Sequence, residues 1–187
     1  MDNIIRETVE ILKKGAIILY PTDTIWGIGC DATNPNAVER VYKLKQRDTN
    51  KGLLVLIHNP NLLNQYINDV PEVAWDIVEV ADKPLTIIYP DAKNLASNLI
   101  AADGSIGIRV VKHTFCERLI HRFRKPIVST SANISGSPSP KGFYDIDDRI
   151  LDGVDYIVPS EFDESPSTAP SGVIKLGKGG EIKVIRE

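Results

Sequence analysis

The sequence predicts an α/β fold, a twisted open sheet of mixed parallel and antiparallel strands with helices on its faces. Short apolar runs, which are typical of buried strands, alternate along the chain with stretches of helical periodicity. The last two expected strands are separated only by residues 177–180, a glycine-rich turn that would join them as an antiparallel hairpin. The length of 187 residues and the hydrophobic content of 42% fit a single domain covering residues 1–187.

In the first third of the chain, helices and strands follow from local signals. Apolar residues recur with helical spacing over residues 2–14, and Gly15 is a natural end for this helix. Asn34 and Pro35 predict the start of a second helix, because asparagine caps helix N-termini and proline is tolerated in the first turn; this helix ends near Lys45. Strands are expected at residues 16–20, 25–30 and 53–57.

The remaining elements follow the same signals. Helices are expected after Asn59 and after Val70, each of which precedes a proline, and over residues 113–123. A short helix should end the loop-like stretch 134–150, and the Ser/Pro-rich stretches 135–140 and 165–171 should be surface loops. Strands are expected at residues 84–89, 105–111, 126–128, 156–158, 173–176 and 182–185.

Composition excludes several classes of protein. A net charge of −3 is unlike a dedicated nucleic-acid binder, which is usually basic. Cys30 and Cys116 match no zinc spacing and are expected to be buried, reduced thiols, and the three histidines share no metal-ligand spacing. The charged N-terminus is unlike a signal peptide, and no apolar run reaches membrane-spanning length. We therefore expect a cytoplasmic protein with no membrane segment and no protein-held metal.

The segment STSANISG, residues 129–136, is the strongest functional signal. It follows the apolar run 126–128, so hydroxyl and carboxamide groups should stand at the C-terminal end of a central strand. In open α/β sheets ligands bind at that position, and these groups suit phosphate or carboxylate oxygens. The alternative is an ordinary Ser/Asn-rich turn. Two standard phosphate motifs do not apply: there is no Gly-x-x-x-x-Gly-Lys-Ser/Thr loop, and Gly27 and Gly29 precede the next helix without opening it, which favours close-packing positions.

Further candidate ligand groups lie outside this segment. Lys45 and Arg47 come at a helix end, where they could bind phosphates beside Ser131 and Asn133 or simply complement the helix dipole. Arg109 lies inside an apolar strand, so it must either form an ion pair or face a ligand; the sequence leaves both open. The segment 22–24, Thr-Asp-Thr, follows a buried strand and reads either as a turn or as part of a site.

Taken together, these segments resemble the YrdC-like threonylcarbamoyl-AMP synthases over almost the whole chain. The most specific match is YPTDTIWGIGCDA at residues 20–32. The family's Lys-x-Arg, Gly-x-Arg, Ser-x-Asn and Pro-Ser motifs appear at residues 45–47, 107–109, 131–133 and 170–171. The chain resembles the short form of the family, without the additional C-terminal domain of some relatives.

The resemblance implies a YrdC-like fold and a nucleotidyltransferase. L-threonine, bicarbonate and ATP, delivered with Mg²⁺ as Mg-ATP, would give threonylcarbamoyl-AMP and pyrophosphate. The product would pass to tRNA threonylcarbamoyl transferase proteins for N6-threonylcarbamoyladenosine in tRNA. The resemblance assigns catalysis and nucleotide binding to Lys45, Arg47, Ser131 and Asn133, threonine binding to Thr24, Arg109 and Ser171, and a further nucleotide contact to Arg186.

Two of the departures from the family's pattern bear on the amino-acid pocket, and two alternative functions stay open. Leu56 stands where the family often has histidine, and Gly172 where threonine usually follows Pro-Ser. Both predict a changed amino-acid pocket with weaker discrimination against serine. Residues 135–141 have a composition that permits a lid. The alternatives are a double-stranded RNA- or tRNA-binding protein and a YciO-like paralogue with a different activity. The RNA contact would use Arg118, His121, Arg122, Arg124 and Lys125.

Overall fold

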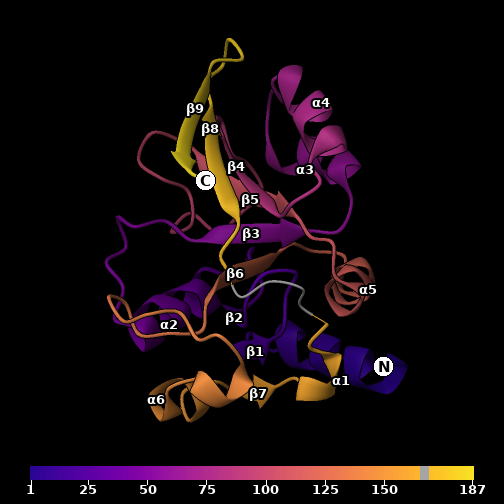
Figure 1. Cartoon of the computed structure of the whole chain (residues 1–187), viewed down its shortest axis with the longest axis vertical. Coiled ribbons are helices and arrows are strands. Elements are labelled where there is room, and N and C mark those ends of the chain that lie inside the picture. Colours follow the sequence, from indigo (N-terminus) through magenta and orange to yellow (C-terminus); the bar gives the residue numbers. More distant parts are fainter. Residues whose placement is uncertain (165–168) are drawn as a thin grey trace.

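A computed structural model describes residues 1–164 and 169–187, so the expected loop 165–171 lies partly outside the described residues. Strands and helices alternate along the chain and form an α/β structure (Figure 1). The α-helices are α1 (Asp2–Lys13), α2 (Pro35–Lys45), α3 (Leu63–Tyr66), α4 (Val73–Val80), α5 (Thr114–Phe123) and α6 (Asp148–Leu151). The strands are β1 (Ile18–Tyr20), β2 (Gly27–Gly29), β3 (Leu54–Ile57), β4 (Leu85–Tyr89), β5 (Ile106–Val110), β6 (Ile127–Ser131), β7 (Tyr156–Ile157), β8 (Gly172–Leu176) and β9 (Ile182–Arg186).

The strands described here form one sheet in the order β7-β1-β2-β6-β3-β5-β4-β8-β9. The pairs β1–β7, β3–β5 and β4–β8 are parallel, and the other neighbouring pairs are antiparallel. The mixed sheet expected from the sequence is therefore confirmed, as is the antiparallel hairpin of β8 and β9. None of the helices in the described ranges is long and apolar enough to cross a membrane.

Helices cover both faces of the sheet because successive strand residues point to opposite sides. Ile18 and Tyr20 pack with α1 and α5 on one face, whereas Leu19 packs with α2 on the other. Leu56 and Val55 of β3 divide in the same way between the two faces. Cys30 and Cys116 are buried, free thiols, as expected, and burial raises the pKa of each.

The N-terminus of α2 forms as its sequence predicts. Asn34 accepts hydrogen bonds from the backbone N–H groups of Asn36 and Ala37, at 3.0 and 3.2 Å, and Pro35 occupies the first turn. Gln46 ends the helix in the left-handed region with a φ of 50°. Because the buried face of α2 includes Val41 and Lys45, the helix directs Lys45 into the protein.

Two elements differ from the expectation. The strand expected at 126–128 continues to Ser131, because the polar residues of β6 pair with Gly27 and Ile28 of β2. The helix expected after Asn59 begins as a 3₁₀ turn, Pro60–Leu62, before α3.

Gly29 brings β2 against its neighbours. A Cβ atom at this position would lie 2.6 Å from both the Tyr20 ring and the Val128 carbonyl oxygen. We expect Gly29→Ala to lower the free energy of unfolding by about 1–3 kcal/mol, the usual effect of overpacking a filled core. Urea denaturation would measure it. Gly142→Ala is the matched control, since nothing lies within 4 Å of its added Cβ. Equal stability of the two variants would contradict the packing role of Gly29.

Candidate functional site

A cleft of about 190 Å³ opens where β6 ends and where β2 and β3 begin. Segments from the start, middle and end of the chain line it, which fits a binding site assembled by the fold. The lining residues are Thr22, Thr24, Ile25, Trp26, Gly27, Arg47, Gly52, Leu53, Leu54, Arg109, Ser129, Thr130, Ser131, Ser139, Pro170, Ser171 and Arg186. β6, which carries three of these side chains, is the fourth strand of the sheet and thus central, as the sequence predicts.

Lys45 holds the polar segment in place from behind. Its side chain is fully buried, and Nζ donates to the backbone oxygens of Ser131 and Asn133, the latter at 2.6 Å. Nζ also lies 3.4 Å from Oδ1 of Asn133. Burial, with a smaller effect from the charge of Arg47, lowers the pKa of Lys45 to about 7. The three oxygen acceptors act in the opposite direction, since each accepts a hydrogen bond from the ammonium group.

Asn133 fixes the turn that follows β6. Its Nδ2 donates to the backbone oxygens of Ile134 and Ser137 at 3.0 and 2.6 Å, and its Oδ1 accepts from Oγ of Ser131. Lys45 and Asn133 are absent from the cleft lining. In this structure they therefore support the wall from which Ser131 and Ser139 face the cleft. The phosphate contacts expected of Lys45 and Asn133 stay a prediction.

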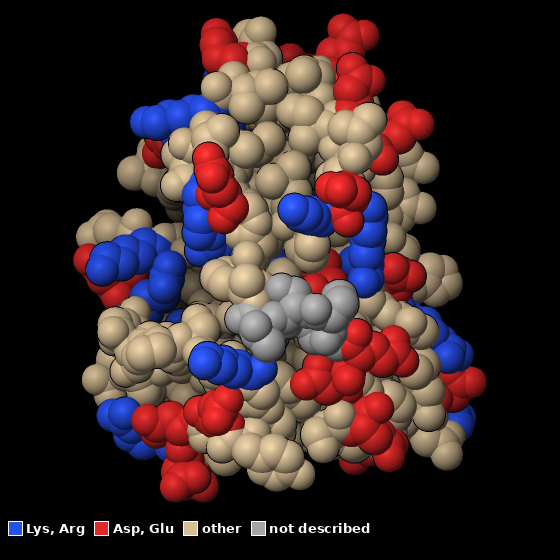
Figure 2. Space-filling model, in the orientation of Figure 1, with Lys and Arg blue, Asp and Glu red and all other residues tan. Residues whose placement is uncertain are grey.

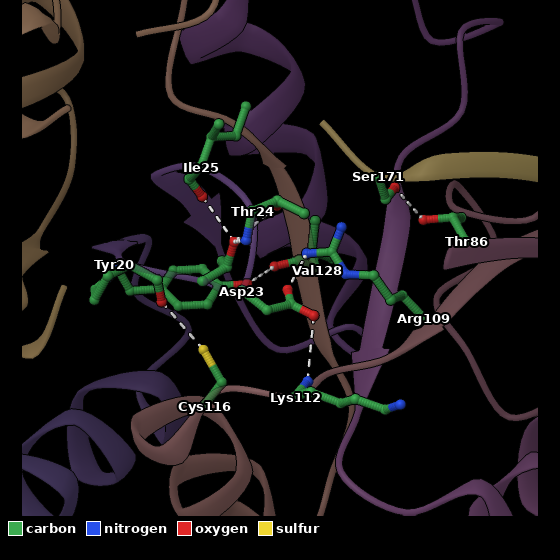
Figure 3. A network of polar contacts seen from close by, with 12 residues as sticks. Tyr20, Asp23, Thr24, Ile25, Thr86, Arg109, Lys112, Cys116, Val128 and Ser171 are labelled. Atoms are coloured by element: carbon green, nitrogen blue, oxygen red, sulfur yellow. Dashed lines mark hydrogen bonds and ion pairs between the residues drawn. The ribbon is translucent and has the colours of Figure 1, made fainter. Parts of the chain in front are cut away.

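Arg109 and Asp23 form a buried ion pair at the base of the cleft (Figure 3). The Nη2–Oδ1 distance is 3.0 Å, and the two side chains are 4% and 3% exposed. Oδ2 of Asp23 accepts from the backbone N–H of Lys112 at 3.2 Å. Nε of Arg109 is buried without a hydrogen-bond partner among the described residues. The structure thus combines the two possibilities left open for Arg109, an ion pair and a position on the cleft.

Hydroxyl groups supply neutral donors around this pair. Thr22 Oγ1 bonds to the backbone oxygen of Ile25 at 2.7 Å and lies 3.0 Å from Thr24 Oγ1. On the opposite wall, Ser171 Oγ lies 2.8 Å from Thr86 Oγ1. Figure 3 marks this contact with a dashed line. These contacts fix the hydroxyl positions before any ligand arrives, which favours tight binding.

The cleft is strongly electropositive. Arg47 lines it and donates to the backbone oxygens of Lys51 and Gly52 at 2.7 and 3.0 Å. Arg186 donates twice to the backbone oxygen of Ser171, at 2.7 and 2.9 Å, and burial together with the charge of Arg109 lowers its pKa. No carboxylate lines this cleft in the described part of the chain, and Asp23 beneath it is bound to Arg109. In Figure 2, basic side chains gather across the middle of the molecule, at the level of β3 and β6 in Figure 1. The cleft is suited to a ligand with several negative charges.

Of the eight residues named from the sequence, six line the cleft: Thr24, Arg47, Arg109, Ser131, Ser171 and Arg186. Their individual roles stay predictions. Five further lining residues have polar groups in their side chains, and the sequence assigned none of them an individual role: Thr22, Trp26, Ser129, Thr130 and Ser139. Most of these residues lie in the recognised motifs, so their position in a motif is the sequence signal that could have identified them as cleft residues. Ser139 places one residue of the stretch 135–141 at the cleft; whether that stretch is a lid stays a prediction.

Leu56 does not line the cleft, and its expected effect on discrimination against serine stays a prediction. Leu56 is fully buried in the core with α1 and α5 and is absent from the cleft lining. It pairs in register with Arg109, so it can affect the cleft through that side chain. Gly172 follows Ser171 and is also absent from the lining; an added Cβ would meet Leu85 at 3.4 Å.

The cleft offers a metal ion hydroxyls but no set of carboxylates. No group of three or more His, Cys, Asp or Glu residues in the described ranges could hold a metal ion. Asp23, which lies beneath the cleft, already bonds to Arg109 and to the N–H of Lys112. These residues fit a Mg²⁺ ion that is carried by the phosphates of a substrate better than one held by the protein alone.

The fold and the cleft together define an α/β protein with an arginine- and hydroxyl-lined site for an anionic ligand. Residues 10–187 match the family model Sua5_yciO_yrdC, described as telomere recombination. The chain belongs to this Sua5/YciO/YrdC family.

Several curated relatives carry one name. The chain is 35% identical over 164 residues to threonylcarbamoyl-AMP synthase of Photobacterium profundum, covering 86% of this chain and 88% of that one. It is 35% identical over 181 residues to the protein of the same name from Pseudoalteromonas translucida, with 95% of each chain covered.

Two solved structures are similar. P. abyssi Sua5 complexed with L-threonine has a TM-score of 0.85 and 26% identity; the match covers 92% of this chain and 50% of that one. The chain thus spans about half the length of that structure. E. coli YciO has a TM-score of 0.82 and 26% identity, with coverage of 100% and 90%. The YrdC-like fold expected from the sequence is therefore confirmed.

Proposed function

We propose that this protein is a threonylcarbamoyl-AMP synthase that acts as a nucleotidyltransferase. The observation that carries the proposal is the cleft, where Arg47, Arg109 and Arg186 converge beside hydroxyl groups, with no opposing carboxylate among the described residues of its lining. ATP and an amino-acid carboxylate both present oxygens with negative charge, which guanidinium groups bind in a fixed geometry. The names of the relatives and the L-threonine complex of P. abyssi Sua5 support the same substrates.

The proposed reaction needs positioning and charge neutralisation more than a strong base. The amine nitrogen of L-threonine first bonds to the carbon of bicarbonate, and water leaves, which gives a carbamate. A carboxylate oxygen of this carbamate then attacks the α-phosphorus of ATP, and pyrophosphate departs with its Mg²⁺. In such a transfer, arginines stabilise the charge spread over the phosphate oxygens. The hydroxyls of Ser131 and Thr130 would bind the phosphates, and Arg109 and Ser171 would hold the threonine carboxylate and hydroxyl.

Pyrophosphate release by the purified protein tests the proposal. With ATP, Mg²⁺, L-threonine and bicarbonate present, we expect pyrophosphate together with a threonylcarbamoyl-AMP product visible by mass spectrometry. Omission of threonine should abolish both signals. Pyrophosphate release that does not depend on threonine would reject the proposal. We expect this activity in the cytoplasm, where ATP, threonine and tRNA occur together, and we expect tRNA threonylcarbamoyl transferase proteins to use the product.

A YciO-like activity is the second candidate, because E. coli YciO matches the whole length of this chain. The same assay separates the two. A YciO-like paralogue with a different activity would make no threonylcarbamoyl-AMP from threonine, bicarbonate and ATP.

Arg47→Ala should lower the activity about 10- to 100-fold, since a hydrogen bond to a charged group contributes about 1.5–3 kcal/mol. Arg47 lines the cleft, and hydrogen bonds to the backbone oxygens of Lys51 and Gly52 hold its guanidinium group in place. Steady-state pyrophosphate release measures the loss, and circular dichroism checks the fold. Arg149→Ala is the control, because that arginine is 61% exposed and away from the cleft. Unchanged activity in Arg47→Ala would exclude a direct role for this side chain.

A further inference from the structure

A second hollow lies at the opposite end of β3 and β6 from the cleft. Its volume is about 300 Å³, and His58, Leu62, Tyr66, His121, Arg124 and Lys125 are among its lining residues. His58 follows the last residue of β3, and Lys125 lies just before β6, whereas the cleft lies before β3 and after β6. In Figure 1, the arrow of β3 points towards α3 and α5, between which this hollow opens.

One side of this hollow carries two basic side chains, Arg124 and Lys125, beside a pair of histidines. The rings of His58 and His121 meet edge to face with centroids 5.2 Å apart, and Arg124 and Lys125 line the hollow as well. Lys125 is paired with Asp31 at 2.7 Å, but the described residues offer the Arg124 guanidinium no carboxylate. Asp and Glu are absent from the lining among these residues. The positive charge of Arg124 is therefore available to an anion.

Arg124 occupies an unusual backbone position. It is the C-cap of α5 with a φ of 61°, in the left-handed region where glycine is the favoured residue. This conformation turns the chain sharply between α5 and β6, and Arg124 lies in the connection between these two elements. The backbone therefore places Arg124 beside the hollow, which its side chain lines.

The other side of the hollow is apolar and aromatic. Ile57, Leu62, Tyr66 and Ile120 form it, with the carboxamide of Gln65 at the edge. A bare phosphate ion would leave these surfaces in contact with water. A planar ring would cover them and could stack on the Tyr66 ring. A cationic side next to an apolar side matches a phosphate joined to a base.

His58 gives a separate indication of a ligand. Its Nδ1 is buried and has no hydrogen-bond partner among the described residues. Buried polar atoms in native proteins nearly always have a partner, so an orphan beside a hollow indicates a missing water or ligand.

We propose that this hollow binds a free nucleoside monophosphate, with the phosphate at His121 and Arg124 and the base against Leu62 and Tyr66. This site is separate from the cleft and does not depend on the proposed function. The residues of the hollow contribute nothing to the cleft lining.

The histidine ring signals in NMR spectra test the proposal, with AMP as the probe. We expect millimolar AMP to shift the signals of both His58 and His121, and adenosine or inorganic phosphate to have much weaker effects. AMP could also enter the cleft, so the titration is repeated with Arg47→Ala, in which the same shifts should persist. Arg124→Glu should weaken the response at least about tenfold, the effect of losing a charged hydrogen bond.

Arg122→Glu is the matched control for charge. It lies on the same helix and has the same charge change, but it lines a neighbouring hollow instead of this one. It should retain the AMP response. Four results would overturn the proposal. They are no histidine shift with AMP, an equal shift with inorganic phosphate, a shift with an RNA oligonucleotide but none with AMP, or an AMP response that Arg122→Glu weakens as much as Arg124→Glu does. The RNA result would instead support the RNA-binding alternative, whose salt dependence would be steep.

Discussion

Replacing Lys45 with methionine should reduce threonine-dependent pyrophosphate release by more than about a hundredfold, the typical effect of losing a preorganised donor at a reaction centre, because we predict that Lys45 contacts the phosphates of ATP. It should also lower the free energy of unfolding by about 2–4 kcal/mol, because the backbone oxygens of Ser131 and Asn133 would lose their charged donor inside the protein. The activity falls for a second reason, since these two residues define the wall from which Ser131 faces the cleft. Urea denaturation and the pyrophosphate assay measure the two effects.

Lys43→Met is the matched control, two residues earlier on the same helix. Lys43 pairs with Glu39 on the surface, where its side chain is 74% exposed. Exposed pairs of this kind contribute at most about 1 kcal/mol, so the control should keep its activity and nearly all of its stability. If Lys45→Met is as active and as stable as Lys43→Met, the buried ammonium does not organise the site. The sequence alone suggests that Lys45→Ala leaves the fold intact; the burial of Lys45 changes that expectation.

Arg109→Ala should have the largest effect on stability, about 3–5 kcal/mol, because it leaves the buried carboxylate of Asp23 without its partner. It should also remove most of the activity, since the cleft loses one of its three guanidinium groups. Thermal and urea denaturation measure the first effect. Activity measured at a temperature where the variant is still folded gives the second.

A double variant separates the two roles of Arg109. Asp23→Asn with Arg109→Gln removes both charges and keeps polar side chains of similar size, so much of the lost stability should return. Activity should stay low, because no cation replaces the guanidinium at the cleft. Recovery of activity along with stability would mean that Arg109 serves only as the partner of Asp23.

Local signals in the sequence predicted most of the helices and strands. Asn34 and Pro35 predict the start of α2, and the glycine-rich stretch between β8 and β9 predicts their hairpin; both are found. The extension of β6 to Ser131 could not be predicted. Its polar residues lack the apolar pattern of a buried strand, and they are held in the sheet by pairing with β2, about a hundred residues earlier in the chain.

The motifs predicted which segments meet at the cleft but not which way each side chain points. Thr24, Arg109 and Ser171 reach it as expected. Lys45 and Arg47 belong to the same motif. Lys45 is the last residue of α2 and points into the protein, whereas Arg47 follows the end of the helix and lines the cleft. Burial depends on what packs against each position, and a motif does not encode that.

The sequence by itself determined the elements and the chemical groups of the site, because capping, periodicity and turn residues act between near neighbours. The tertiary structure decided the strand order, the pairing of Asp23 with Arg109, the burial of Lys45 against residues 86 positions away, and the removal of Leu56 into the core. These depend on contacts between distant segments, whose free energy is set by the packing of the whole sheet and its helices. The hollow beside His58 and His121 is also decided by the tertiary structure, since no local sequence pattern brings these two rings together.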